Sequence, residues 1–198
     1  MNGYGKVHVI YGYGAGKTSA SVGRAIRAAG AGLNVVYVSF MKGGESSEVK
    51  LLREIPKIDY YCPGAHDFIP EGGIPTKSQV EHAMMALNYA ESCSDKKENE
   101  WYDLYYDKKV NSKDDLCNNN EPNMLICDEI LTAAFWNVIE LKQVVGLIRG
   151  KRNDLELIMT GHFCPPEIQC CADYASEINN IKHPYEECGL QARRGIEF

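Results

Sequence analysis

Three glycines alternate with other residues at the junction between an apolar run and a helical pattern, close to the start of the chain. The apolar run is Val7-His8-Val9-Ile10-Tyr11, and Gly12-Tyr13-Gly14-Ala15-Gly16-Lys17-Thr18-Ser19 follows it directly. From Lys17 to Ala29 apolar residues recur at helical spacing, before glycines at 30 and 32. A strand, a glycine-rich turn and a helix in this order form a phosphate-binding loop, because glycines let backbone amides approach phosphate oxygens.

The two residues after the last glycine fit the same chemistry. A lysine at this place neutralises phosphate charge, and the next hydroxyl can bind magnesium, so Lys17 and Thr18 are the candidates. The general pattern G-x-x-x-x-G-K-[ST] would place its first glycine at position 11, which is Tyr11 here. An ordinary glycine-rich turn before a helix is therefore the alternative interpretation.

An apolar strand with two carboxylates at its end forms a second element. Met124-Leu125-Ile126-Cys127 is continuous in apolar residues, and Asp128 and Glu129 follow it. In P-loop proteins that bind nucleotides, such a strand end holds the magnesium ion. The alternative is a strand that ends in a solvated acidic turn. Together, the two elements predict binding of a nucleoside triphosphate with magnesium.

Apolar runs alternate with helical patterns along the rest of the chain. We expect further strands at 35–40, 58–61, 155–159 and 174–181, and helices at 48–54, 77–90 and 141–148. Continuous apolar strands alternating with helices indicate an α/β fold: a three-layer P-loop nucleotide-binding fold whose mostly parallel central sheet has helices on both faces. We expect a single domain over 1–198, a loop at 62–76 and a polar surface insertion at about 92–122.

The chain has a negative net charge that is unevenly distributed along the sequence. Its 21 Lys and Arg against 27 Asp and Glu give a net charge of −6, of which the stretch 91–121, with nine acidic and five basic residues, contributes −4. This balance argues against nucleic acid as a partner, and the absence of a long apolar run argues against a membrane span. The start of the sequence does not resemble a signal peptide, so we expect a cytoplasmic protein with reduced thiols.

The cysteines and histidines near the C-terminus raise the question of a metal site. The eight cysteines include no C-x-x-C pair. Six residues could suggest zinc: His162, Cys164, Cys170, Cys171, His183 and Cys188. Their spacing fits no standard zinc pattern, so we interpret them as reduced and partly buried side chains.

Several further segments have counterparts in one known family. These are Gly23–Gly30 after the loop, Phe40-Met41-Lys42-Gly43, Glu48 before Leu51-Leu52, Asp128-Glu129-Ile130, Thr160-Gly161 with Pro165-Pro166-Glu167, and the tail Lys182–Tyr185, Gly189–Ala192 and Gly195–Phe198. With the loop Gly-x-Gly-x-Gly-Lys-Thr, they resemble the P-loop class of ATP:corrinoid adenosyltransferases. The resemblance covers nearly the whole chain apart from 62–76 and 92–122.

The resemblance implies a reaction in which cobalt(I) of a reduced corrinoid attacks the 5′ carbon of ATP and triphosphate leaves. It implies that ATP is held by the loop residues Gly12, Tyr13, Gly14, Ala15, Gly16, Lys17, Thr18 and Ser19. Outside the loop, the implied ATP contacts are Lys42, Glu48 and His162. The implied catalytic residues are Lys17, Thr18 and Glu129. Magnesium would lie at Thr18, Asp128 and Glu129, the last through water. The implied partners are cob(I)alamin or a corrinoid precursor, a flavoprotein-type reductant that supplies cobalt(I), and a second copy in a homodimer.

Departures from the family pattern leave an alternative open. The family loop often has Asn and Lys where this chain has Tyr13 and Ala15, and His162 replaces an arginine after T-G. The family's aromatic corrinoid-side segment has no clear match in Gly64-Ala65-His66-Asp67-Phe68. The alternative is a nucleotide-binding module or carrier that retains the ATP site without efficient adenosylation. An ordinary phosphotransferase is a third possibility, which would leave the C-terminal resemblance unexplained.

Overall fold

The computed structural model describes residues 5–43, 46–64, 73–94 and 121–197. Within these residues, six parallel strands form one sheet in the order β3-β2-β4-β5-β1-β6. The strands are β1 (Val7–Tyr11), β2 (Val35–Ser39), β3 (Ile58–Tyr61), β4 (Met124–Asp128), β5 (Glu156–Gly161) and β6 (Tyr174–Glu177). All six strands end at the same edge of the sheet, where ligands bind in folds of this kind.

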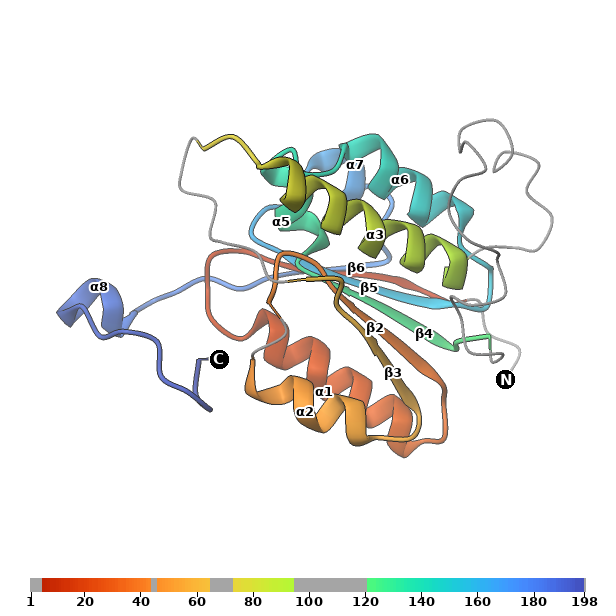
Figure 1. Cartoon of the computed structure of the whole chain (residues 1–198), viewed down its shortest axis with the longest axis horizontal. Helices are drawn as coiled ribbons and strands as arrows, with labels where there is room; N and C mark the ends of the chain where they lie inside the picture. The colour runs from red at the N-terminus through yellow and green to blue at the C-terminus, as the bar shows by residue number, and fades with distance from the viewer. Residues whose placement is uncertain (1–4, 44–45, 65–72, 95–120, 198) are drawn as a thin grey trace.

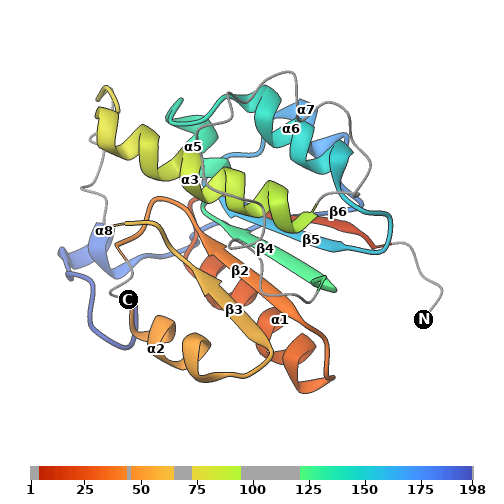
Figure 2. The ribbon, with the colours of Figure 1, turned by 45° about the vertical axis from the view of Figure 1, so that its right-hand side comes forward.

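Helices cover both faces of the sheet (Figure 1). One face carries α1 (Lys17–Gly30) and α2 (Ser47–Glu54), and the other carries α3 (Lys77–Ser94), α5 (Ile130–Phe135) and α6 (Leu141–Gly150), as Figure 2 shows from a second side. The short helix α7 (Pro166–Gln169) lies beside α6. These three layers confirm the predicted α/β architecture with a parallel sheet.

The two cores follow the alternation of side chains along each strand. On the central strand β4, Leu125 and Cys127 point into the core beneath α3, α5 and α6, whereas Ile126 points into the core beneath α1 and α2. All three side chains are fully buried, and the two aliphatic ones, Leu125 and Ile126, contribute about 1.5–3 kcal/mol each. Asp128 comes next in the alternation and therefore faces α1, where it is also fully buried.

Some element bounds differ from the expectations. Helix α3 continues to Ser94, with Cys93 and Ser94 buried, so 92–94 are helix and not the start of an insertion. The remainder of the predicted insertion up to residue 120, and residues 65–72 of the predicted loop, lie outside the described residues. Strand β6 ends at Glu177 and not at residue 181, because its partner strand β1 ends at Tyr11, which is paired with Glu177. Helices α5, α7 and α8 (Pro184–Cys188) were not expected, because four to six residues are too few to show a helical period.

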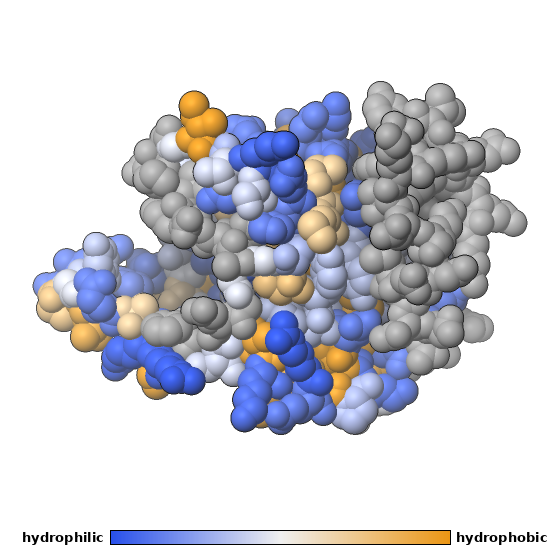
Figure 3. All heavy atoms as spheres, in the orientation of Figure 1, coloured by the Kyte–Doolittle hydropathy of each residue, from blue (hydrophilic) through white to orange (hydrophobic). Residues whose placement is uncertain are grey.

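The C-terminal segment from Ile181 onward extends away from the sheet (Figure 1). In the space-filling view it forms a separate lobe with both hydrophobic and hydrophilic residues on its surface (Figure 3). Large apolar side chains on it are strongly exposed, including Ile181, Tyr185, Leu190 and Ile196. In the described part of the chain, no helix has the length and apolar character that crossing a membrane requires.

Candidate active site

The site lies at the edge of the sheet where the strands end. The glycine loop follows β1, Lys42 follows β2, Asp128 ends β4 with Glu129 behind it, and His162 follows β5. Residues from four separate parts of the sequence therefore meet at one place because the strands are parallel.

Two of the loop glycines have backbone conformations that favour glycine. Gly12 has a φ of 117° and Gly16 a φ of 105°, a left-handed region that costs other residues free energy. Gly16 is the N-cap of α1, and no side chain caps this helix. The amides of its first turn lack partners within the helix, so the amides of residues 17–19 are available for phosphate oxygens.

Other loop amides already have partners in the protein. The Gly12 amide donates to the carbonyl oxygens of Gly161 and His162, at 3.1 and 3.0 Å. The Gly14 amide donates to the Ile178 carbonyl at 2.8 Å, and the Ala15 amide to a side-chain oxygen at 3.2 Å. The resemblance implies that residues from Gly12 to Ser19 hold ATP, but the amides of Gly12, Gly14 and Ala15 are already bonded, so the amides left for the triphosphate are at the end of the loop and the start of α1.

Lys17 folds back over the loop. Its Nζ donates to the Gly14 carbonyl oxygen at 3.0 Å, and its side chain is buried. Burial lowers the pKa of this ammonium, and the nearby charges of Glu129 and Asp128 oppose the shift. A positive charge kept partly from water inside a loop of amides is well placed to interact with an anion.

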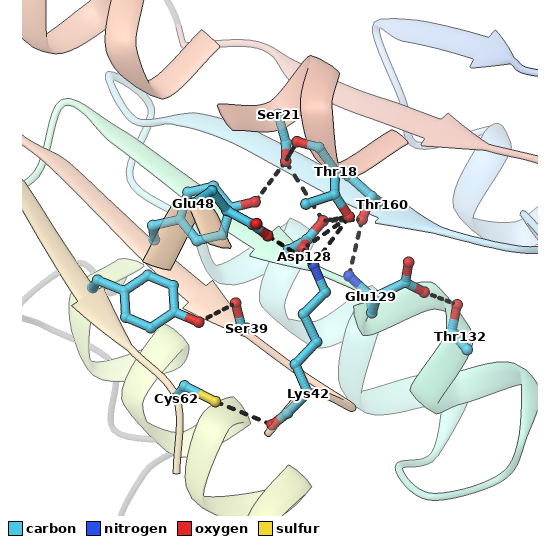
Figure 4. Close-up of polar contacts among 12 residues, drawn as sticks. Thr18, Ser21, Ser39, Lys42, Glu48, Cys62, Asp128, Glu129, Thr132 and Thr160 are labelled. Carbon is cyan, nitrogen blue, oxygen red and sulfur yellow. Dashed lines mark hydrogen bonds and ion pairs between the residues drawn. The ribbon is translucent and has the colours of Figure 1, made fainter. Parts of the chain in front are cut away.

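Asp128 is the centre of the polar contacts (Figure 4). Its carboxylate is fully buried and accepts a hydrogen bond from the Thr160 hydroxyl at 2.7 Å. The Thr18 hydroxyl lies 3.3 and 3.4 Å from its two oxygens, and the Ser21 hydroxyl lies at 3.5 Å. Thr18 and Ser21 are both on α1, so this helix supplies its first amides to the phosphate loop and also part of the surroundings of Asp128.

Lys42 occupies the space between these oxygens. Its Nζ lies 2.7 Å from Asp128 Oδ2 and 3.1 Å from Thr18 Oγ1, with Glu48 Oε1 at 3.7 Å (Figure 4). Burial by itself would lower the pKa of Lys42, but the adjacent Asp128 and Glu48 carboxylates outweigh it and the pKa is raised. Lys42 is therefore charged at neutral pH and neutralises Asp128.

Glu129 is held by two threonines. Its backbone amide donates to Thr160 Oγ1 at 2.9 Å, and its carboxylate accepts a hydrogen bond from the Thr132 hydroxyl. Thr132 also accepts from the His162 amide at 3.0 Å. No sequence motif indicates Thr132 or Ser21; the only signal is their spacing of three residues from Glu129 and from Thr18.

His162 lies against the loop. Its ring stacks on the exposed Tyr13 ring, with 5.5 Å between ring centroids and 4° between planes. Burial lowers the pKa of His162 and Lys17 acts in the same direction, with Glu129 opposing them. The imidazole is therefore neutral at pH 7 and does not supply the charge of the arginine that it replaces.

A hard cation fits the oxygen atoms at this place. Carboxylate and hydroxyl oxygens are the ligands that magnesium prefers, and Asp128 and Thr18 provide them beside the phosphate loop. Among the residues that the structure describes, no group of three or more His, Cys, Asp and Glu side chains could hold a metal ion. A magnesium ion here would thus depend on phosphate oxygens and water for its remaining ligands.

The C-terminal cysteine and histidine residues lack the geometry of a zinc site. Cys164 is buried, and burial raises its pKa to about 11, so it is a neutral thiol at physiological pH. Cys170 and Cys188 are exposed. The His183 ring accepts a hydrogen bond from the Tyr185 amide at the start of α8.

The chain is similar to known proteins over nearly its whole length. A family model described as ATP:corrinoid adenosyltransferase BtuR/CobO/CobP matches residues 3–198. The corrinoid adenosyltransferase CobA of Salmonella typhimurium is 26% identical over 194 residues, which are 98% of this chain and 86% of the relative. The corrinoid adenosyltransferase of Pseudomonas aeruginosa is 26% identical over 196 residues, with 98% and 84% covered.

Among solved structures, EssC (ATPases 2 and 3) from Geobacillus thermodenitrificans aligns with 98% of this chain and 36% of its own, at a TM-score of 0.44 and 14% identity. This likeness is too low to bear on function. The family match spans the phosphate loop, the Asp128–Glu129 strand end and the C-terminal segment. This chain therefore belongs to the ATP:corrinoid adenosyltransferase BtuR/CobO/CobP family.

Proposed function

We propose that this protein transfers the 5′-deoxyadenosyl group of ATP to cobalt(I) of a reduced corrinoid. The cobalt(I) electron pair forms the cobalt–carbon bond to C5′ while the bond from C5′ to oxygen breaks, and the triphosphate leaves with the electron pair of that C5′–oxygen bond. The observation that carries the proposal is the family match over residues 3–198 together with a phosphate loop that faces a buried aspartate.

The residues of the site would act on the leaving group. The amides at the end of the loop and the Lys17 ammonium would bind the triphosphate and stabilise its charge as it departs. Cobalt(I) is itself a strong nucleophile, so no residue is needed as a catalytic base. Catalysis would consist of alignment of C5′ with the cobalt and stabilisation of the leaving triphosphate.

Magnesium would be held by Thr18 and Asp128, with Glu129 contributing through water, and it would neutralise phosphate charge. The Lys42 ammonium lies on the same two oxygen-bearing side chains, within 3.1 Å of each. Two cations cannot share this position, so magnesium binding requires that Lys42 leaves Asp128. Glu48, 3.7 Å from the Lys42 Nζ, is the nearest carboxylate that would remain beside the displaced ammonium.

The proposed partners follow from the family. The substrate would be cob(I)alamin or a corrinoid precursor, a flavoprotein-type reductant would supply cobalt(I), and the protein would act as a homodimer in the cytoplasm. The exposed apolar side chains after Ile181 are compatible with contact to a second copy. One observation favours the alternative of a nucleotide-binding module: the neutral His162 does not provide the positive charge that the arginine at this place in the family would bring to the loop.

The test is an anaerobic assay with ATP, magnesium and chemically reduced cob(I)alamin. We expect a light-sensitive adenosyl-cobalt product, seen by its absorption spectrum, and one triphosphate released per product. The Lys17→Ala variant should lose this activity while it keeps the fold by circular dichroism. The Lys50→Ala variant, with an exposed side chain on α2, is the matched control. ATP binding by the wild-type protein without any adenosyl product would support the binding module instead.

A further inference from the structure

The chain segment that follows β6 packs directly on the phosphate loop. After Glu177, the Ile178 amide donates to the Tyr11 carbonyl at 2.8 Å, and the Ile178 carbonyl accepts from the Gly14 amide at 2.8 Å. Two residues later, Asn180 reaches the loop with its side chain. Residues 178–180 are more than 160 positions away from the loop in sequence, so only the fold brings them together.

This packing explains two of the three loop glycines. A Cβ atom on Gly12 would lie 2.3 Å from the Ile178 carbonyl oxygen. A Cβ atom on Gly14 would lie 2.7 Å from both the Ile178 oxygen and its Cγ2 atom. The third, Gly16, has open space around its Cβ position and is accounted for by its positive φ alone. The close approach of the segment after β6 is therefore the reason why positions 12 and 14 are both glycine.

Asn180 holds the loop with both ends of its carboxamide. Its Oδ1 accepts from the Ala15 amide at 3.2 Å, and its Nδ2 donates to the Tyr13 carbonyl at 3.3 Å. The two contacts lie on either side of Gly14, whose amide is bound by the Ile178 carbonyl and whose carbonyl is bound by Lys17 Nζ. Three consecutive loop residues are thus fixed from outside the loop, just before the amides that face the phosphate position.

We propose that Asn180 is a positioning residue for the phosphate loop. It acts through the loop and does not touch ATP itself: by fixing the peptide groups from Tyr13 to Ala15, it aligns the following amides of residues 17–19 and keeps Lys17 over the site. The inference rests on the proposed ATP site and adds to it a residue that the recognised motifs do not include.

The expected effect is a loss of affinity for the triphosphate part of ATP. Two hydrogen bonds between neutral, partly exposed groups hold the loop, so their removal in Asn180→Ala should weaken binding about 10-fold. Because the loop binds only the phosphates, the affinities for magnesium-ATP and for inorganic triphosphate should fall by the same factor. In the adenosylation assay, KM for ATP should rise while kcat changes little. Asn180→Asp should weaken binding further and in a salt-dependent way, because it loses the donor to Tyr13 and adds a negative charge near the triphosphate.

The control is Asn179→Ala, which removes the same side chain from the exposed neighbouring position. Binding is measured by isothermal titration with magnesium-ATP and, separately, with inorganic triphosphate, and the melting temperature of each ligand-free variant is recorded. A wild-type protein that binds neither ligand would refute the proposed function rather than this inference. If the wild type binds both ligands and Asn180→Ala binds them equally well, the inference is wrong. It is also wrong if ATP affinity falls while triphosphate affinity does not, because Asn180 would then contact the adenosine. A common loss of melting temperature and of kcat would indicate a general structural role and overturn positioning as well.

Discussion

Replacing Lys42 by methionine tests whether this lysine holds the place of magnesium. The variant keeps the length and the apolar part of the side chain but removes the ammonium that lies 2.7 Å from Asp128 Oδ2. Asp128 is fully buried, whereas the Lys42 side chain is 19% exposed. Removing one partner of a buried ion pair costs about 3–5 kcal/mol, because it leaves the other charge unpaired.

The expected loss lies at the lower end of that range. Asp128 keeps the hydrogen bond from Thr160 at 2.7 Å and the weaker contacts to Thr18 and Ser21, and solvent reaches part of the Lys42 side chain. We therefore expect Lys42→Met to lower the free energy of unfolding by about 3 kcal/mol in the absence of metal, which corresponds to about 6–12 °C in melting temperature for a chain of this size. The exposed Lys50→Met should change it by less than about 0.5 kcal/mol.

The decisive comparison is between urea unfolding in EDTA and in millimolar magnesium, followed by circular dichroism. A cation that binds only the folded state stabilises it. If magnesium binds at the site proposed above, it has to displace Lys42 in the wild type, whereas in Lys42→Met the oxygens of Asp128 and Thr18 are free to receive it. Magnesium should therefore stabilise the variant more than the wild type and reduce the difference between them. Equal stabilisation of both proteins, or a variant as stable as the wild type in EDTA, would refute the reasoning that Lys42 and magnesium share one position.

Two further predictions concern groups whose pKa is shifted by burial. Lys17→Met should reduce the affinity for ATP about 100-fold or more, measured by titration calorimetry. The ligand-free variant should be at least as stable to urea as the wild type, because burial lowers the pKa of this ammonium and so disfavours its charge. A marked loss of stability in the variant would contradict this. His162 has a folded-state pKa below its ordinary value of 6.5, so the unfolded chain takes up a proton first as the pH falls and stability is lost from about 6.5 downward. His162→Gln should therefore show a shallower decrease of unfolding free energy over this range, and an unchanged slope would show that the imidazole does not control it.

Much of the fold could be predicted because its central strands are buried on both faces. Runs such as residues 124–127 are continuously apolar, which distinguishes a central parallel strand from an alternating surface strand. The departure at Tyr11 also has a structural explanation. Tyr11 is the last residue of β1, in a regular parallel register with Gly161, and the first positive φ falls at Gly12. No glycine is therefore required at position 11.

The contacts that define the site could be predicted only in part. Residue types pointed to Lys17, Thr18 and Asp128, because phosphate and magnesium chemistry limits the choice of side chains. The approach of Ile178 and Asn180 to the loop has no local signal, since it depends on where β6 ends at the edge of the sheet. Short threonine contacts such as Thr132 to Glu129 leave no period in the sequence either.

Backbone turns with positive φ separate the side chains of Asp128 and Glu129 and direct Lys42, after β2, back toward the site. Among the described residues, the non-glycine residues with positive φ are Met41 at 49°, Glu129 at 65° and Asn137 at 54°. Asparagine tolerates this region, whereas the other two pay about 1–2 kcal/mol each. Met41 directly precedes Lys42, and Glu129 is itself a residue of the candidate site.

The neighbours of Met41 and Glu129 explain why these conformations persist. The buried Phe40 donates its amide to the Asp128 carbonyl at 2.8 Å, so the β2–β4 pairing continues one residue past β2 before Met41 turns the chain and Lys42 comes back over the end of β4. At Glu129 the turn starts α5, and the carboxylate meets the Thr132 hydroxyl while Asp128 meets Lys42. Strained backbone held in place by its surroundings is typical of functional sites. Here it gives the adjacent acids different partners: the Lys42 ammonium neutralises Asp128, whereas the Thr132 hydroxyl donates a hydrogen bond to Glu129.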